Sequence, residues 1–158
     1  MPLSSKQKEI LYLETISEAD AVCAGLDDPV AIMASLVSIL KTKFEYFFWV
    51  GFYRKKSANE LIIGPYQGSL ACLFIPFNKG VCGKAASSLK TQIVADVDQF
   101  PGHIACDSRS KSEIVVPFIN SAGELVAVLD VDSDEYNSFC EEDQKGLEAL
   151  LNLFSEKF

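Results

Sequence analysis

Hydrophobic and polar positions follow a helical rhythm in the first part of the chain. In residues 30–44, apolar side chains recur every three or four positions, which is the spacing of an amphipathic helix. The repeating residues are Met33, Leu36, Val37, Leu40 and Phe44. Asp28 and Pro29 stand just before this run and predict its N-cap and its first helical residue. Another helix is expected over residues 5–23.

The middle of the chain changes to strand-like patterns. The run "YFFWVGFYR" is aromatic and β-favouring, so it predicts a central strand. The runs "ELIIGPYQG" and "ACLFIPF" predict further strands, with breaks at Gly64-Pro65 and at Gly68. Residues 78–90 predict a glycine-bearing turn that enters a short helix, and residues 91–97 predict a strand.

The last third predicts a β-hairpin and a final helix. The hairpin consists of "EIVVPFI", the turn "NSAG" and "ELVAVLDVD". Ser138 is the expected cap of the helix. Its apolar face is formed by Leu147, Leu150, Leu151 and Phe154. This order of elements predicts an α+β fold, in which helices pack on a mainly antiparallel sheet.

Composition limits the classes of function. With 158 residues, 49% hydrophobic and 23% charged, the chain has the balance of one folded domain. A net charge of -8, with Lys and Arg totalling 14, argues against nucleic acid as a partner. The N-terminal "MPLSSKQKEILYLET" lacks the apolar core of a signal peptide. The longest apolar stretch, "YFFWVGFY", is too short to span a membrane, so the cytoplasm is the expected compartment.

One long irregular segment, residues 96–116, separates two strand-like runs. Such loops are uncommon in compact domains, and ordered ones are often functional. This one contains Cys106 together with His103, Arg109 and Lys111, a polar and cationic setting of the kind that lowers the pKa of a thiol. His103, the only histidine, has two readings: a general base, or a hydrogen-bonding residue that orders the loop after a Pro-Gly pair.

The other four cysteines carry weaker signals. No CxxC pair occurs, so the sequence supports neither a zinc knuckle nor a thioredoxin-type motif. Cys82 stands at the start of the short helix, where unpaired amides favour a thiolate. Cys72, within an apolar run, reads by itself as an inert core residue. Cys23 and Cys140, in or beside helices, read as structural.

The hairpin places three acids together. If "NSAG" is a four-residue loop, Ile119 faces Glu124, and counting back sets Glu113 opposite Asp130. Asp132 follows two residues later, so all three carboxyl groups are expected on one face of the sheet. Crowded carboxylates raise the pKa of at least one member, or they hold a cation.

An alternative interpretation of these acids is a solvated strand end. In the same register Lys111 lies opposite Asp132 and neutralises part of the charge. Pro117 cannot donate to the hydrogen-bond ladder, so it predicts an edge or a bulge. Cys106 argues against this interpretation, because it lies only seven residues before Glu113. A reactive thiol, partner thiols and an acid cluster together suit thiol chemistry on a small cationic or protonatable substrate.

Four short sequence motifs resemble those of a known protein family. They are "GVCG", "FPGHIACD", "SEIVVP" and "LDVDS", in that order, with cysteine spacings of 10 and 24 residues. Together they resemble the free methionine-(R)-sulfoxide reductases, which are built on a GAF domain. The resemblance covers nearly the whole chain, including "FFWVGFY" and the C-terminal helix. One departure is "PFNKGVCG", where the family more often has a glycine close after the proline, and we expect it to alter a turn only.

The resemblance implies a single GAF-like catalytic domain, residues 1–158, that reduces free L-methionine-(R)-sulfoxide. By position, Cys106 is the nucleophile, whose thiolate attacks the sulfoxide sulfur, releases methionine and becomes a sulfenic acid. Cys72 is then the main resolving cysteine, which forms a disulfide with Cys106, and Cys82 is an additional one. Thioredoxin or another dithiol reduces the disulfide, and no further cofactor or metal is implied.

The resemblance also implies a substrate site. Glu113, Asp130 and Asp132 correspond to its acids, and Trp49 and Tyr53 to its aromatic wall. One carboxyl with a raised pKa can protonate the sulfoxide oxygen, and the others can hold the ammonium group of a free amino acid. The indole face can accept the S-methyl group. A homodimer is compatible with the resemblance, because members of the family are often dimeric.

Two rival functions remain open on the sequence. The first is a non-catalytic GAF module that senses a small ligand, with the cysteines as passengers. An acid-rich pocket speaks against a nucleotide as that ligand, because it repels phosphate. The second is a cysteine-based redox switch, in which the disulfide regulates a partner.

Overall fold

Six strands form one antiparallel sheet in the computed structural model, which describes residues 2–104 and 106–158. The strand order is β3-β2-β1-β6-β5-β4. The strands are β1 (Trp49–Lys55), β2 (Glu60–Gln67), β3 (Phe74–Pro76), β4 (Gln92–Val94), β5 (Ser112–Ile119) and β6 (Leu125–Ser133). The helices are α1 (Ser5–Val22), α2 (Pro29–Lys43), α3 (Gly80–Ser88) and α4 (Glu141–Asn152), with short 3₁₀ turns at Val97–Gln99 and Ser155–Lys157.

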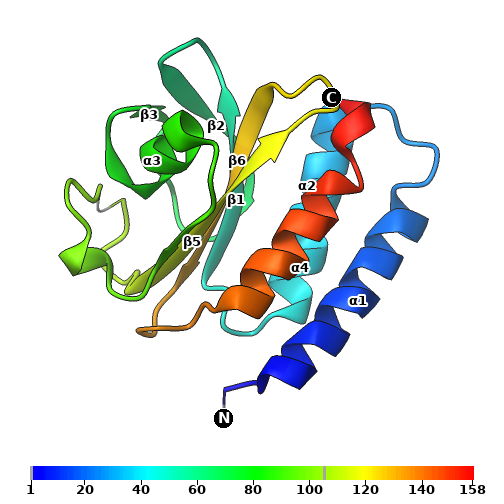
Figure 1. Ribbon diagram of the computed structural model, residues 1–158, viewed down its shortest axis with the longest axis horizontal. Helices are drawn as coiled ribbons and strands as arrows, with labels where there is room; N and C mark the ends of the chain where they lie inside the picture. The colour runs from blue at the N-terminus through cyan, green and yellow to red at the C-terminus, as the bar shows by residue number, and fades with distance from the viewer. Residues whose placement is uncertain (1, 105) are drawn as a thin grey trace.

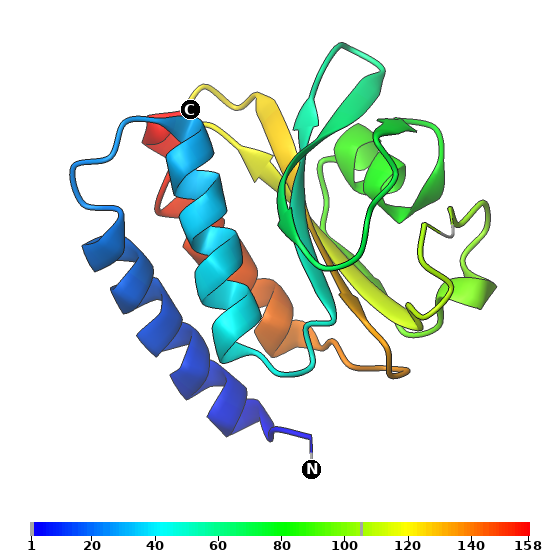
Figure 2. The same cartoon turned by 180° about the vertical axis from the view of Figure 1, so that it is seen from behind.

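The helices divide unequally between the two faces of the sheet (Figures 1 and 2). Helices α2 and α4 cover one face, and α1 packs outside them against both. Helix α3 and the long loop before β5 lie on the opposite face. The predicted α+β class is therefore confirmed. Among the residues that the structure describes, no helix combines the length and the apolar composition needed to cross a membrane.

Side-chain alternation along the central strands builds a separate core on each face. Val50 and Phe52 of β1 point to the helices α2 and α4, as do Leu129 and Val131 of β6. The alternate positions belong to the second core, which α3 completes. Its members include Trp49, Tyr53, Val115, Val128 and, from α3, Val81, Cys82 and Ala85. One face of the sheet therefore serves the main core, and the other is free to build a site.

The caps of the helices bear out one sequence signal and correct another. The carboxylate of Asp28 accepts a hydrogen bond from the amide of Ala31 at 2.8 Å, and Pro29 begins α2 as predicted. Helix α4, however, is capped by Cys140 and not by Ser138. Asp143 causes this shift, because its side chain accepts from the backbone N–H of Cys140 at 2.8 Å and fixes the first turn there.

The hairpin has a different register from the expected one. Glu113 pairs with Asp132, and Val115 pairs with Asp130. A bulge between Phe118 and Ile119, with a longer turn closed from the amide of Asn120 to Glu124, moves the register by two residues. Because the shift is even, each side chain keeps its face of the sheet, so the three acids still share one.

Pro117 lies where the sequence predicts it, and Gly64-Pro65 marks a bulge and not the end of a strand. Pro117 pairs with Val128 inside β5, but β4 covers β5 only as far as Val115. The missing N–H of Pro117 therefore falls where β5 is an edge, next to the predicted bulge. Strand β2 continues through Gly64-Pro65, but its register with β1 shifts there: Gly51 pairs with Tyr66 and Tyr53 with Ile63, so Gly64 and Pro65 of β2 stand opposite Phe52 alone.

A buried polar network joins α1 to the start of α4. Lys8 donates from Nζ to Asp143 at 2.5 Å and to the carbonyl of Ser138 at 2.9 Å. The hydroxyls of Tyr12 and Tyr46 donate to the other oxygen of Asp143 at 2.9 and 2.5 Å. Gly146 makes this approach possible, since a Cβ there would meet the ring of Tyr12 at 2.1 Å.

Candidate active site

The candidate site is a pocket on the α3 face of the sheet, roofed by the long loop and by the segment before β3. The residues predicted from the sequence that line it are Trp49, Tyr53, Cys82, Cys106, Glu113, Asp130 and Asp132. Cys72 is the remaining predicted site residue, and it is joined to Cys106 by a disulfide. Cys23 and Cys140 are free thiols away from the pocket, as their structural reading expects.

Strand pairing sets the acids and the tryptophan in adjacent rows. Asp132 lies between Glu113 on β5 and Trp49 on β1, while Asp130 lies beside Gly51. Gly51 is needed because a Cβ there would meet the indole of Trp49 at 2.4 Å. The indole is fixed further by its Nε1–H, which donates to the carbonyl of Ser69 at 3.0 Å. The aromatic wall is thus held rigidly beside the acids.

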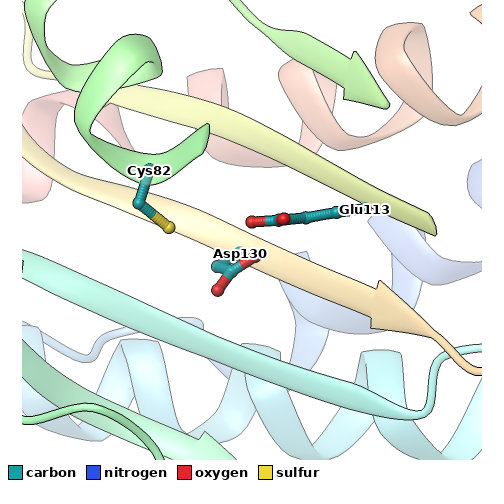
Figure 3. A group of neighbouring side chains, drawn as sticks. All are labelled: Cys82, Glu113 and Asp130. Atoms are coloured by element: carbon teal, nitrogen blue, oxygen red, sulfur yellow. The ribbon is translucent and has the colours of Figure 1, made fainter. Parts of the chain in front are cut away.

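Cys82, Glu113 and Asp130 converge from three elements, α3, β5 and β6 (Figure 3). One donor atom from each lies within 4.8 Å of the others, and all three residues are buried. A thiol with two carboxyl groups is a donor set that suits a borderline-soft divalent cation such as Zn²⁺. The same carboxyl groups also suit an ammonium group.

Burial controls the protonation of this cluster. It raises the pKa of Glu113, Asp130 and Asp132 well above the usual carboxyl range, and the neighbouring carboxyl charges raise it further. Burial also raises the pKa of the Cys82 thiol, with Asp130 the next cause. The expectation that the helix N-terminus makes Cys82 a thiolate is therefore wrong, because desolvation and three acids outweigh the amides.

One atom of the cluster lacks a partner. Asp130 is only 7% exposed, and among the described residues nothing forms a hydrogen bond with its Oδ1. A buried carboxyl oxygen without a donor costs free energy, so the arrangement favours a ligand that brings one. An amino-acid ammonium group supplies both the hydrogen bonds and the charge.

His103 lines the pocket beside Glu113. Its Nε2 lies 3.6 Å from Oε2 of Glu113, too far for a good hydrogen bond. Burial lowers the pKa of His103, despite the opposing charge of Asp98, while it raises the pKa of Glu113. Both shifts favour the neutral forms, so they weaken an ion pair between the two groups.

The disulfide between Cys72 and Cys106 joins the segment before β3 to the long loop, and Cys106 lines the pocket. Their Cα atoms are 5.5 Å apart, within the range of unstrained bridges. Cys72 lies before β3, half-buried, and not inside a core strand as its apolar neighbours suggest. The cations near Cys106 in sequence have contacts elsewhere: Arg109 pairs with Asp107 at 2.8 Å, and Lys111 lies over the ring of Tyr136.

Sequence reasoning missed the residues that hold the long loop over the pocket. The hydroxyl of Ser69 donates to Asp107 at 2.5 Å, and the side chain of Arg109 donates to the same carboxylate. These bonds, with that from Arg109 first, lower the pKa of Asp107 well below its usual range. The signal in the sequence was local: Asp107 also accepts from the backbone N–H of Arg109, and Asp readily forms such an Asx-turn with the backbone two residues later.

Comparison with known families decides the assignment of the fold. The sequence profile described as the GAF domain matches residues 27–156, which leaves α1 outside the match. The chain belongs to the GAF domain family. Its pocket therefore occupies one face of a GAF sheet, between that sheet and α3.

Relatives of this GAF protein include enzymes. It is 45% identical to "GAF domain-containing protein A" of Dictyostelium discoideum, over 97% of this chain and 96% of that one. It is 50% identical over 110 residues to the free methionine-R-sulfoxide reductase of Saccharomyces cerevisiae, covering 68% of this chain and 61% of the yeast protein. The structure of free methionine-R-sulfoxide reductase from Neisseria meningitidis, in complex with its substrate, superimposes with a TM-score of 0.91 at 43% identity, covering 96% and 90% of the two chains. The resemblance inferred from the four motifs is confirmed.

Proposed function

We propose that the protein reduces free L-methionine-(R)-sulfoxide to L-methionine by cysteine redox chemistry. The observation that carries this proposal is the disulfide between Cys72 and Cys106 at a pocket lined by three buried acids. The disulfide is the state expected after one turnover. Relatives named for this activity, including one solved with its substrate, support the same conclusion.

The reaction starts from the dithiol form. The Cys106 thiolate attacks the sulfoxide sulfur while the oxygen takes a proton, methionine leaves, and Cys106 becomes a sulfenic acid. The Cys72 thiol then attacks that sulfenic acid, so that water leaves and the disulfide forms. One sulfoxide oxygen departs as water, and the two electrons come from the two cysteines.

The acid cluster supplies the proton and the recognition of a free amino acid. Glu113 or Asp132 is the proton donor, because burial and mutual repulsion keep a proton on this group near neutral pH. Asp130, whose Oδ1 has no partner among the described residues, receives the substrate ammonium. The indole of Trp49, beside Asp132 and near Tyr53, accepts the S-methyl group.

Cys82 has a lesser redox role in this proposal. Its thiol is buried, and desolvation with three acids keeps it protonated, whereas Cys72 already bridges to Cys106. A protonated buried thiol is a poor nucleophile. Cys82 therefore resolves the sulfenic acid only as a secondary partner, and its position among the acids matters more.

The proposal also covers the remaining components. Thioredoxin or another dithiol reduces the disulfide, and the chemistry needs no other cofactor or metal, since the cysteines carry both electrons. The catalytic unit is a single GAF-like domain over residues 1–158. The cytoplasm is the expected compartment, because a reducing environment recycles such a disulfide.

Resolved epimers of free methionine sulfoxide test this function. With dithiothreitol as reductant, the protein should convert the R epimer to methionine over many turnovers and leave the S epimer intact. A ligand sensor binds a sulfoxide without consuming it, and a redox switch forms its disulfide without sustained methionine release. Absence of turnover with the R epimer, in protein shown to have reduced Cys72 and Cys106, would overturn the proposal.

A further inference from the structure

Cys82 is a buried thiol that the proposed reaction uses only as a secondary partner. It is 4% exposed, stands near the start of α3, and takes no part in the disulfide between Cys72 and Cys106. A substrate ammonium group gains little from it, because sulfur is a weak hydrogen-bond acceptor. The position of this thiol among carboxyl groups therefore indicates a second kind of ligand, one to which sulfur binds strongly.

The geometry of the cluster is close to that of a metal site. One donor atom each from Cys82, Glu113 and Asp130 lies within 4.8 Å of the other two. In Figure 3 the thiol of Cys82 and the carboxyl end of Glu113 point toward one another, with Asp130 below them in the view. Ligand atoms around a tetrahedral Zn²⁺ lie about 3.3–3.8 Å apart, given bonds of about 2.0–2.3 Å. The donors therefore need to approach by at most about 1.5 Å, a shift within the reach of side-chain rotation.

Asp130 gives a second, independent indication of a ligand. Its side chain lines the pocket and is only 7% exposed. Its Oδ1 has no hydrogen-bond partner within residues 2–104 and 106–158. A buried carboxyl oxygen in this state costs free energy, and a metal ion bonded to it offsets that cost.

The charge of the pocket also favours a cation. Four acids line it, namely Asp107, Glu113, Asp130 and Asp132. No lysine or arginine lines it in the part of the chain that the structure describes. Arg109 balances Asp107 at 2.8 Å, so the other three acids supply the negative charge that an ion meets. The pocket includes Leu70, which is 78% exposed, so it reaches the surface and an ion can enter.

We propose that Cys82, Glu113 and Asp130 form a binding site for a divalent metal ion of the Zn²⁺ class. A sulfur ligand beside carboxylate oxygens selects such an ion over Mg²⁺ or Ca²⁺, which prefer oxygen ligands alone. A water molecule completes the tetrahedron. On binding, Cys82 becomes a thiolate and both carboxyl groups become carboxylates, and the protons that they held pass to solvent.

The metal ion and the substrate compete for the same residues. Asp130 is the proposed acceptor of the substrate ammonium, and Glu113 is one of the two candidate proton donors. An ion held by both leaves neither free for the sulfoxide. This competition rests on the proposed function, whereas the metal site itself does not depend on it.

Cobalt titration of the oxidised protein tests the metal site. The disulfide keeps Cys72 and Cys106 from binding metal, and the free thiols are Cys23, Cys82 and Cys140. Co²⁺ is the probe, because a thiolate ligand gives it a charge-transfer absorption band and a tetrahedral site gives it intense d–d bands. We expect one Co²⁺ per chain with both kinds of band, and its displacement by Zn²⁺.

Three variants locate the bound ion. Cys82→Ser should abolish the charge-transfer band, and Asp130→Asn should raise the Kd for Co²⁺ at least about tenfold, the loss that even an outer-shell partner causes. Cys140→Ser is the matched control and should keep both bands, because the neighbouring carboxylate of Asp143 is already bound by Lys8. A wild-type protein without the charge-transfer band, a band that survives in Cys82→Ser, or an unchanged Kd in Asp130→Asn overturns the site. Loss of the band in Cys140→Ser also overturns it and places the ion beside Asp143.

A second titration separates the competition from the proposed function. Cys72→Ser combined with Cys106→Ser removes the nucleophile and its partner, so the pocket can bind the sulfoxide without reducing it. At a concentration of L-methionine-(R)-sulfoxide ten times its own Kd, the calorimetric Kd for Zn²⁺ should rise about tenfold. A sulfoxide that binds and leaves the Zn²⁺ Kd unchanged contradicts the competition. A sulfoxide that does not bind contradicts the proposed function and leaves the metal site standing.

Discussion

Two buried aspartates show how differently one fold treats the same group. Asp143, fully buried between α1 and α4, accepts from Lys8, Tyr12, Tyr46 and the amide of Cys140. Asp130, on the other side of the sheet and 7% exposed, has an oxygen with no partner among the described residues. The first carboxylate is satisfied from every direction, and the second stands among other acids.

The two aspartates differ in the partners that surround their buried carboxyl groups. A buried charge is tolerated when an opposite charge and hydrogen bonds replace its water, and the network around Asp143 provides both. The cluster around Asp130 contains Glu113 and Asp132, and burial first and then neighbouring carboxyl charges raise the pKa of all three, so folding alone gains nothing from it. Sites that break local rules in this way are expected to be functional. We infer that the first aspartate secures a helix and the second awaits a cation.

The largest expected effect is the loss of activity on replacing Cys106 in the pocket, with little change in stability. Cys106→Ser should abolish methionine release even in a single turnover, because the hydroxyl is a far poorer nucleophile than the thiolate. Rapid-quench measurement of methionine per enzyme checks this. The free energy of unfolding of the reduced protein should hardly change, since Cys106 is exposed.

Two further cysteine variants sharpen this result. Cys72→Ser should still release about one methionine per enzyme and then fail to recycle through thioredoxin. Cys82→Ser keeps both bridge cysteines, so it should still form the disulfide. A full single-turnover yield from Cys106→Ser would move the nucleophile to Cys82.

Amide variants of the two aspartates should have opposite effects: one should lower stability and the other should lower activity. Asp143→Asn leaves the Lys8 charge buried without its counter-charge and should lower the free energy of unfolding by about 3–5 kcal/mol. Asp130→Asn removes one of three crowded acids and should be close to neutral for stability, yet should lower kcat/KM by about 10² or more. Urea titration measures the free energy of unfolding of both variants, and steady-state kinetics measures their kcat/KM. Similar stability losses in the two would erase the distinction between a structural and a functional aspartate.

Much of the fold could be read from the sequence because its signals are local. Each of these signals acts over a few residues: the N-cap and first-turn proline of α2, the aromatic strand β1 and the alternation in β5 and β6. The hairpin register was wrong, since a bulge and a longer turn depend on packing that alternation does not encode. The acids were nevertheless placed on the right face, because an even shift preserves it.

The site was predictable as a set of residues and less so as an electrostatic environment. The sequence motifs identified the cysteines and acids that meet at the pocket. Position at a helix start suggested a thiolate at Cys82, but the pKa rises because β5 and β6 bring acids against it from far along the chain. The bond from Ser69 to Asp107 joins segments 38 residues apart, and no pattern along the chain reports such a contact.

A smaller effect appears in the pH dependence of stability. Glu113, Asp130 and Asp132 have raised pKa values in the folded protein, so they keep protons that the unfolded chain releases from about pH 4 upward. The free energy of unfolding should therefore fall as pH rises through this window, by up to about 1.4 kcal/mol per pH unit for each proton held. Glu113→Gln should flatten that slope, while Glu45→Gln, at an exposed position, should not.

Amide variants of the two candidate proton donors should also change the pH–rate profile. If the lost carboxyl supplies the proton, the basic limb of the pH–rate profile should move or disappear in Glu113→Gln or in Asp132→Asn. Near-native rates and an unchanged basic limb in both variants would exclude these acids as the proton donor.

The most direct measurement of the pocket's purpose compares free and N-acetylated methionine-(R)-sulfoxide as substrates of the wild-type protein. Acetylation leaves the reacting sulfur unchanged and removes the ammonium charge that the acid cluster is proposed to bind. With dithiothreitol as the common reductant, kcat/KM for the acetylated compound should be lower by at least about 10², because a buried charged contact is lost. Values within about threefold of each other would contradict the claim that the carboxyl groups around Asp130 are buried to hold a free amino acid.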